Sequence, residues 1–162
     1  MIYIEKGTEP AFWTEFRKKN PHIQYNDLDS VDDGANARIQ LKEYNVSQQR
    51  GLCAYCCRSI DAENSHNEHI KPKGVGRYAN LSMEYSNIVA SCNTDNTCGS
   101  IKGDKFDEEQ FVSPLDPDCE SEFDFFPNGE IVSDSAAGQY TIQLLNLNSY
   151  RLIQLRRARL KA

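Results

Sequence analysis

The middle of the chain gathers cysteine, histidine and carboxylate side chains, the residue types that bind metal ions and move protons. Four of the six cysteines form two pairs, C-x2-C and C-x5-C, separated by 35 residues: Cys53, Cys56, Cys92 and Cys98. Four thiolates delivered by two such pairs can complete the tetrahedral coordination of Zn²⁺. The spacing therefore predicts a structural zinc site that joins distant parts of the chain, with four free thiols as the alternative.

A histidine between the cysteine pairs is placed to act in hydrolysis. Glu68 directly precedes His69, and Asn87 follows 18 residues after His69. Hydrolysis of a phosphodiester bond needs a base that activates water, a divalent cation at the phosphate, and a group that orients the base. His69 suits the base because imidazole titrates near neutral pH, and Glu68 suits Mg²⁺ or Mn²⁺ because its oxygens are hard ligands. The Asn87 carbonyl could fix the tautomer of the base.

The spacing alone leaves a simpler alternative for these residues. A glutamate beside a histidine is often an ordinary surface pair, and Glu68 and His69 could be one. The other two histidines, His22 and His66, fit no pattern.

The charge of the chain does not exclude a nucleic-acid partner, although it is negative overall. The chain has 18 basic and 24 acidic side chains, a net charge of −6. Ten of the acidic residues lie in the segment 106–139, which has no basic residue, so a basic face can exist elsewhere. We expect this acidic block either to dock on a basic surface of a partner or to be solvated. The cations expected to meet phosphates are Lys71, Lys73, Arg77 and Lys102.

The flanking segments are predicted to be mainly helical. Apolar spacing predicts helices over residues 10–20 and 35–50. Asn128-Gly129 between two short apolar runs predicts a β-hairpin. The segment 141–162 predicts one or two helices, the second of which Ser149 could cap.

The middle of the chain is predicted to contain two short strands and one short helix. Residues 63–73 indicate a strand entering a loop, residues 86–92 a second strand or turn, and residues 97–106 the start of a helix. We expect a single α+β domain, 1–162, in three parts: a helical N-terminal arm (1–49), a zinc-stapled core (50–106), and an acidic hairpin with C-terminal helices (107–162).

The sequence shows no signal for export or membrane insertion. No stretch approaches the ~20 consecutive apolar residues of a membrane-spanning helix. The first residues lack the basic lead and apolar block of a secretory signal. We therefore expect a cytoplasmic protein without a membrane partner, whose reduced thiols favour metal binding over disulfides.

The order of four motifs resembles the ββα-metal nuclease motif called HNH, in its variant with four zinc-binding cysteines: CAYC, EHIKPK, SNIVASCN and CGSIKGD. Three flanking stretches are similar to the HNH nuclease subunit of the Septu anti-phage system (PtuB), also found beside some retrons: MIYIEKGTEP, SPLDPDCE and TIQLLNLNSYRLIQLRRA. The resemblance covers essentially the whole chain. It implies a metal-dependent endonuclease with a small ββα-metal core between helical arms.

The resemblance also implies roles for individual residues and partners. His69 takes the place of the general base, Glu68 that of the acidic ligand of a catalytic Mg²⁺ or Mn²⁺ ion, and Asn87 that of the central asparagine. The implied substrate is DNA or RNA. The implied partners are an ATPase subunit (PtuA) and, beside some retrons, a retron RNA/DNA complex.

The chain departs from the family pattern at Gly99. The third motif residue, usually a histidine or asparagine directly after the last cysteine, falls on this glycine, which has no side chain to bind a metal. Asp104, Ser100 or a water molecule could take its place. A catalytically weak or inactive zinc-binding adaptor for the ATPase or nucleic acid is therefore an alternative function. A redox or metal-sensing module that uses Cys57 and Cys119 is a third.

Overall fold

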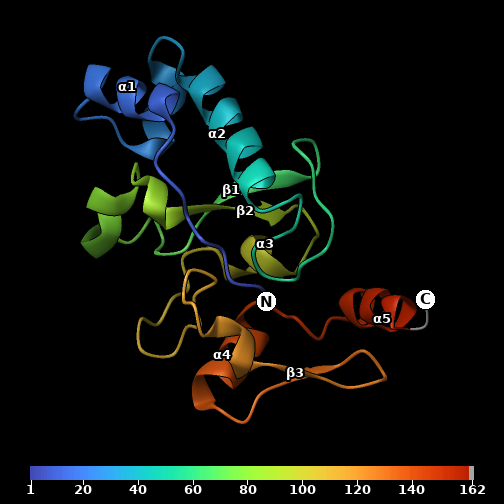
Figure 1. The fold of residues 1–162 in the computed structure, drawn as a ribbon. Coiled ribbons are helices and arrows are strands. Elements are labelled where there is room, and N and C mark those ends of the chain that lie inside the picture. Colours follow the sequence, from blue (N-terminus) through green and yellow to red (C-terminus); the bar gives the residue numbers. More distant parts are fainter. Residues whose placement is uncertain (161–162) are drawn as a thin grey trace.

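Residues 1–160 are described in a computed structural model, which contains helices and two separate pairs of short antiparallel strands (Figure 1). The central pair consists of β1 (Ser65–His69) and β2 (Ile88–Cys92), with Ser65 opposite Cys92 and His69 opposite Ile88. Both strands lie within the ranges that the sequence predicts. The combination of helices and antiparallel strands confirms the expected mixed fold class.

Helices cover the central strand pair on both faces. α2 (Gly34–Gln48) packs against both strands from one side, and α3 (Cys98–Lys102) packs against β2 from the other (Figure 1). All five residues of β2 are buried, which suits their apolar and small side chains. β1 has the polar sequence SHNEH, so this arrangement brings polar side chains into the interior.

The N-terminal arm forms α1 (Ala11–Lys19) and α2, close to the predicted helices. The rings of Trp13 and Phe16 in α1 stack with 5.8 Å between their centroids. They share an apolar core with Leu41 of α2 and with Ile88 at the start of β2. The arm is therefore anchored to one face of the central strands.

A larger apolar core lies on the other face of the strands. It includes Val89 of β2, Tyr55 of the cysteine-bearing turn, and Leu145 and Leu152 from the C-terminal part of the chain. Ile88 and Val89 thus belong to different cores, because neighbouring residues of a strand point to opposite faces. The same alternation applies to their partners on β1, His69 opposite Ile88 and Glu68 opposite Val89.

The predicted C-terminal hairpin is present. β3 (Asp124–Phe125) pairs with β4 (Ile131–Val132) across a turn that contains Gly129. The φ angle of Gly129 is 91°, a conformation that glycine adopts without strain. A Cβ atom at this position would lie 2.4 Å from the Ile153 carbonyl oxygen, so packing also requires glycine here.

Two helices follow the hairpin, α4 (Ala136–Leu144) and α5 (Tyr150–Arg159). Ser149 stands at the N-cap position of α5, but within the described part of the chain its hydroxyl makes no capping hydrogen bond. The predicted helical segment extends to residue 162, and residues 161–162 lie outside the described residues. None of the helices within residues 1–160 combines the length and the apolar composition that a bilayer crossing needs.

Candidate metal centre and active site

Four cysteines from three separate segments meet in one cluster, as the sequence predicts. All four sulfur atoms lie within 4.8 Å of one another: those of Cys53, Cys56, Cys92 and Cys98. They come from a turn before β1, the last residue of β2 and the first residue of α3. Zn–S bonds of ~2.3 Å in a tetrahedron separate sulfur atoms by about 3.8 Å. The Sγ atoms of Cys56 and Cys92 are 3.9 Å apart. The cluster could therefore hold a metal ion such as zinc.

Because these four thiols lie close together, the protonation state of each one shifts the pKa of its neighbours. A hydrogen bond with Cys53 lowers the pKa of Cys92, and another with Cys53 raises the pKa of Cys56. Some thiols must therefore keep their protons so that others can ionise. A divalent cation removes this conflict, because it stabilises the thiolate form of every ligand.

Cys57 and Cys119 lie outside the cluster and lack the features of reactive thiols. Burial raises the pKa of Cys57, and it raises the pKa of Cys119 to about 11. The thiolate is the reactive form of cysteine, so both side chains are protonated and weakly reactive at neutral pH. These pKa values give no support to a redox module.

Glu68 is a buried carboxylate with three polar partners. Its Oε1 lies 2.9 Å from Lys102 Nζ and accepts a hydrogen bond of 3.2 Å from the Tyr55 hydroxyl. Its Oε2 lies 3.5 Å from His66 Nε2. Burial acts to raise the pKa of Glu68, but the hydrogen bond with His66 and the charge of Lys102 outweigh it and hold the pKa below its usual value. Glu68 is therefore ionised, with Oε1 more heavily engaged than Oε2.

His69 ends β1 and is buried on the side of the N-terminal arm. Its Nε2 lies 2.8 Å from the Ser82 carbonyl oxygen, and its ring meets that of Tyr25 edge-on with 4.5 Å between centroids. A carbonyl oxygen only accepts hydrogen bonds, so Nε2 carries the proton and Nδ1 holds a lone pair. Burial lowers the pKa of His69 to about 4, so the imidazole is neutral at pH 7. The ring is held in a form that can accept a proton.

Asn87 forms its hydrogen bonds with the loop after β1 rather than with His69. Its Oδ1 accepts from Lys71 N at 2.9 Å, and its Nδ2 donates to Lys71 O at 2.9 Å. Ser82 fixes the His69 tautomer instead, so the predicted role of Asn87 is wrong in this detail. Asn87 positions the base indirectly, because it fastens the loop that follows it.

Lys102 was expected at a phosphate, but the structure buries it completely. Besides its contact with Glu68, its Nζ donates a hydrogen bond of 2.8 Å to the His69 carbonyl oxygen. The side chain cannot meet a substrate from this position, so the prediction for this residue is wrong. Lys102 instead neutralises a buried carboxylate and fastens α3 to the end of β1.

The other three expected cations are accessible to solvent. Lys71 forms an ion pair with Glu108 of the acidic block. Lys73 is half-buried, and Arg77 is exposed with its guanidinium 4.6 Å from the centre of the Tyr78 ring. Their contact with nucleic acid remains a prediction.

A cleft of about 210 Å³ brings these groups together beside α3. Glu68 and His69 border it with Lys73 and Gly99, and Asp104, one of the replacements considered for the missing ligand, borders it as well. The other replacement, Ser100, donates its hydroxyl proton to Thr94 O at 2.8 Å and is engaged there.

His66 borders the same cleft and was missed by the sequence analysis. Its Nδ1 lies 2.8 Å from Asn93 Oδ1, while Nε2 faces Glu68. Burial acts to lower the pKa of His66, but its hydrogen bonds with Glu68 and Asn93 outweigh this and raise it. One signal could have identified it: residues two apart on a strand point to the same side, so His66 had to share a face with Glu68.

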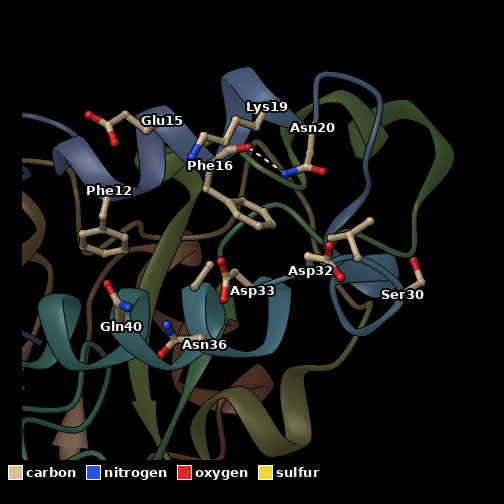
Figure 2. Close-up of a pocket in the computed structure, with 12 residues that line it drawn as sticks. Phe12, Glu15, Phe16, Lys19, Asn20, Ser30, Asp32, Asp33, Asn36 and Gln40 are labelled. Atoms are coloured by element: carbon tan, nitrogen blue, oxygen red, sulfur yellow. Dashed lines mark hydrogen bonds between the residues drawn. The ribbon is translucent and has the colours of Figure 1, made fainter.

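A larger cleft, about 620 Å³, lies elsewhere, between α1 and α2. Figure 2 shows Phe12 and Phe16 pointing from α1 toward α2, with Asp32 and Asp33 at the loop that leads into α2. Its lining contains no histidine or cysteine. It therefore lacks the imidazole–carboxylate pair of the smaller cleft, which is the better candidate for chemistry.

Comparison with known proteins gives two relatives, and no family model matches the chain. The chain is 36% identical over 165 residues to "Retron Vc95 putative HNH endonuclease" of Vibrio cholerae serotype O1 biovar El Tor, covering 94% of this chain and 78% of that protein. It is 31% identical over 112 residues to "Retron Ec83 putative HNH endonuclease" of Escherichia coli, covering 66% of this chain and 42% of that protein. The chain thus spans less than half the length of the second relative.

Fold and site define a small mixed α/β protein with a candidate metal centre beside a carboxylate–histidine cleft. The match to the Vibrio cholerae protein runs along most of both chains. The protein therefore belongs to the family of retron HNH endonucleases. The predicted resemblance to HNH nucleases is confirmed at this level, and its Septu membership stays a prediction.

We expect the Cys53→Ser variant to lose its metal and unfold the central region, because a serine hydroxyl does not replace a thiolate ligand and metal binding is coupled to folding. Elemental analysis should find about one zinc per chain in the wild type and far less in the variant. Cys57→Ser is the matched control, since it changes a cysteine outside the cluster and should keep both metal and fold. A well-folded, metal-free Cys53→Ser protein would contradict a structural metal.

Lys102→Met should lower the free energy of unfolding by about 3–5 kcal/mol, because it leaves a buried charge on Glu68 without its cation. Chemical denaturation of the metal-loaded protein, followed by circular dichroism, measures this loss. Glu68→Gln combined with Lys102→Met removes both charges and should recover much of it. If the single and double variants were equally stable, the buried charge would not be the cause.

Proposed function

We propose that the protein is a metal-dependent HNH endonuclease that hydrolyses phosphodiester bonds of nucleic acid. One observation carries the proposal: a single cleft is lined by His69, whose imidazole is neutral and of defined tautomer, and by Glu68, whose carboxylate is ionised. The names of both relatives favour the same chemistry. We further propose that β1, β2 and α3 are the ββα-metal core, since they follow one another in that order.

In this proposal His69 is the general base. Its Nδ1 takes a proton from a water molecule while the water oxygen attacks phosphorus, and the bond from phosphorus to the leaving oxygen breaks. The leaving oxygen then takes up a proton from solvent. An approaching phosphate brings negative charge near the imidazole, which favours its protonated form. Lys73 and Arg77 would hold neighbouring phosphates.

Glu68 is the proposed acidic ligand of the catalytic ion, Mg²⁺ or Mn²⁺. The Glu68 carboxylate suits such an ion, because it is ionised and its Oε2 has fewer close polar partners than Oε1. When bound, such an ion stabilises the charge that develops on the phosphate and the leaving oxygen. Lys102 and Tyr55 orient the carboxylate through Oε1.

The four-cysteine cluster is the proposed structural zinc site, apart from the chemistry. It still influences the active site, because Tyr55 lies between two of its cysteines in the chain and donates a hydrogen bond to Glu68. A bound zinc ion would therefore help to position the Glu68 carboxylate without contacting the substrate.

His69→Ala should reduce cleavage by about 10²–10⁴-fold, because a general base contributes a factor of that size. The assay incubates purified protein, with and without an ATPase encoded beside it, with DNA and with total RNA in Mg²⁺ or Mn²⁺. His22→Ala, which changes an exposed histidine outside the cleft, is the control and should cleave like the wild type. Metal content should match in all three proteins, and circular dichroism at the assay temperature should show that all three are folded.

The adaptor remains the second candidate because Gly99 supplies no ligand. The two functions differ in one result. If the wild type cleaves neither DNA nor RNA and His69→Ala protects cells from phage as well as the wild type does, the proposed chemistry is wrong and the adaptor stands.

We propose further that the protein acts in the bacterial cytoplasm as an effector of a Septu-like anti-phage system, with an ATPase partner and, in a retron, its RNA/DNA complex. The acidic block 106–139 is the proposed docking surface for a basic face of the ATPase. Within residues 1–160 only one of its ten carboxylates, Glu108, forms an ion pair. The block therefore has ample unpaired negative charge for a partner.

Neutralising five exposed carboxylates of this block should weaken ATPase association, and the loss should be larger at low salt than at high salt. The substitutions are Glu109→Gln, Asp116→Asn, Asp118→Asn, Asp124→Asn and Asp134→Asn. The matched control neutralises five exposed carboxylates of the N-terminal arm: Glu5, Glu15, Asp27, Asp32 and Glu43. Calorimetry at two salt concentrations gives the affinities. Unchanged affinity of the first variant at both salts would show that the block is merely solvated.

A further inference from the structure

We propose that His66 and Glu68 together bind the catalytic divalent cation, with His66 supplying the ligand that Gly99 cannot. The inference rests on the proposed nuclease function and specifies the metal site within it. The protein would contribute one imidazole nitrogen and one carboxylate oxygen, and water and substrate oxygens would complete the coordination shell.

The positions of the two donor atoms suit a shared cation. His66 and Glu68 lie two residues apart on β1 and therefore point to the same face. His66 Nε2 and Glu68 Oε2 are 3.5 Å apart. Two ligand atoms bound at ~2.0–2.2 Å to one ion lie about 3–3.5 Å from each other, so one cation can bind both with little movement.

Asn93 holds the His66 ring in the tautomer that a metal ligand needs. The Asn93 amide nitrogen donates to Ser65 O at 3.3 Å, which turns its Oδ1 toward His66 Nδ1 at 2.8 Å. Nδ1 must therefore donate to Asn93, so the proton that a metal ion would displace is the one on Nε2, which faces Glu68, and its loss leaves the lone pair on Nε2. A metal-binding histidine commonly donates its second ring N–H to an oxygen acceptor in this way.

Gly99 provides the space that this pair occupies. A Cβ atom on Gly99 would lie 2.5 Å from His66 Nε2 and 2.6 Å from Glu68 Oε2. Gly99 is a helical residue of α3 without a positive φ, so its backbone does not require glycine. A side chain at position 99 and the His66 imidazole could not occupy the same space, and in this structure the imidazole occupies it.

A nitrogen ligand changes which cation the site prefers. Mg²⁺ favours a shell of oxygen atoms, whereas imidazole suits transition metals, whose affinity generally rises from Mn²⁺ through Co²⁺ to Ni²⁺. The site should therefore bind Mn²⁺ more tightly than Mg²⁺, and loss of His66 should reduce this preference.

The first test is a titration of the zinc-loaded, full-length protein with Mn²⁺, followed by electron paramagnetic resonance. We expect His66→Ala to weaken Mn²⁺ binding by at least about tenfold, since even loss of a group that only orients a ligand costs 10–100-fold. Mg²⁺ binding, measured by competition, should weaken less. His22→Ala, which changes a histidine outside the cleft, is the matched control and should bind like the wild type.

A second measurement needs no variant for its main result. Pulsed electron paramagnetic resonance of the wild type with Mn²⁺ should show coupling to an imidazole nitrogen, and His66→Ala should abolish it. As a single substitution, Gly99→Asn should weaken Mn²⁺ binding, because its Cβ would clash with His66 and Glu68. Combined with His66→Ala, it should improve binding over His66→Ala, because the new amide can enter the vacated place.

The outcomes separate this inference from the nuclease proposal. Wild-type Mn²⁺ binding without nitrogen coupling, or equal affinity in His66→Ala, would overturn the metal site even if the protein cleaves nucleic acid. Nitrogen-coupled binding that depends on His66 would support the site even if no cleavage were found, in which case the nuclease proposal alone would fail.

Discussion

Convergence of four sulfur atoms within 4.8 Å is the constraint on which the rest of the site depends. The cluster joins a turn before β1, the end of β2 and the start of α3, and each of these carries or supports a residue of the cleft. The turn holds Tyr55 against Glu68, β2 sets the register of β1, and α3 begins with Cys98 and continues into Gly99 and Lys102. A helix as short as α3 would not be stable alone, so its position follows from the cluster and from packing.

The buried pair of Glu68 and Lys102 connects this framework to the chemistry. Burial of two charges is costly, and the cost is offset only when their remaining hydrogen-bonding groups are satisfied. Here the Tyr55 hydroxyl and the His69 carbonyl oxygen supply the additional bonds. The result is a carboxylate that stays ionised in the interior while one of its oxygens still faces the cleft. A catalytic cation proposed at Glu68 would bind weakly, since Lys102 already neutralises part of the charge that would attract it.

Local signals in the sequence predict most of the elements, and tertiary contacts decide most of the site. Asn128-Gly129 marks the hairpin because only a few residues suit such a turn, and paired cysteines indicate convergence because a metal needs all four ligands. Nothing local reveals that Lys102 turns inward, because its partner Glu68 lies 34 residues earlier in the chain. Asn87 bonds to a backbone loop, and side-chain type alone cannot distinguish Ser82 O from Asn87 as the group that orients His69.

The role of Gly99 follows from the side chains that lie beside it in the structure. In the sequence it is a missing ligand, and that absence favours an inactive adaptor. In the structure the same position is filled by His66 Nε2 and Glu68 Oε2, each of which would be within 2.6 Å of a Cβ there. The distance between two ligands on one strand is fixed by the geometry of the strand. The distance between a ligand on a strand and one on a helix depends on how the two elements pack. Such a site would tolerate small movements of α3, because α3 would contribute space rather than a metal ligand.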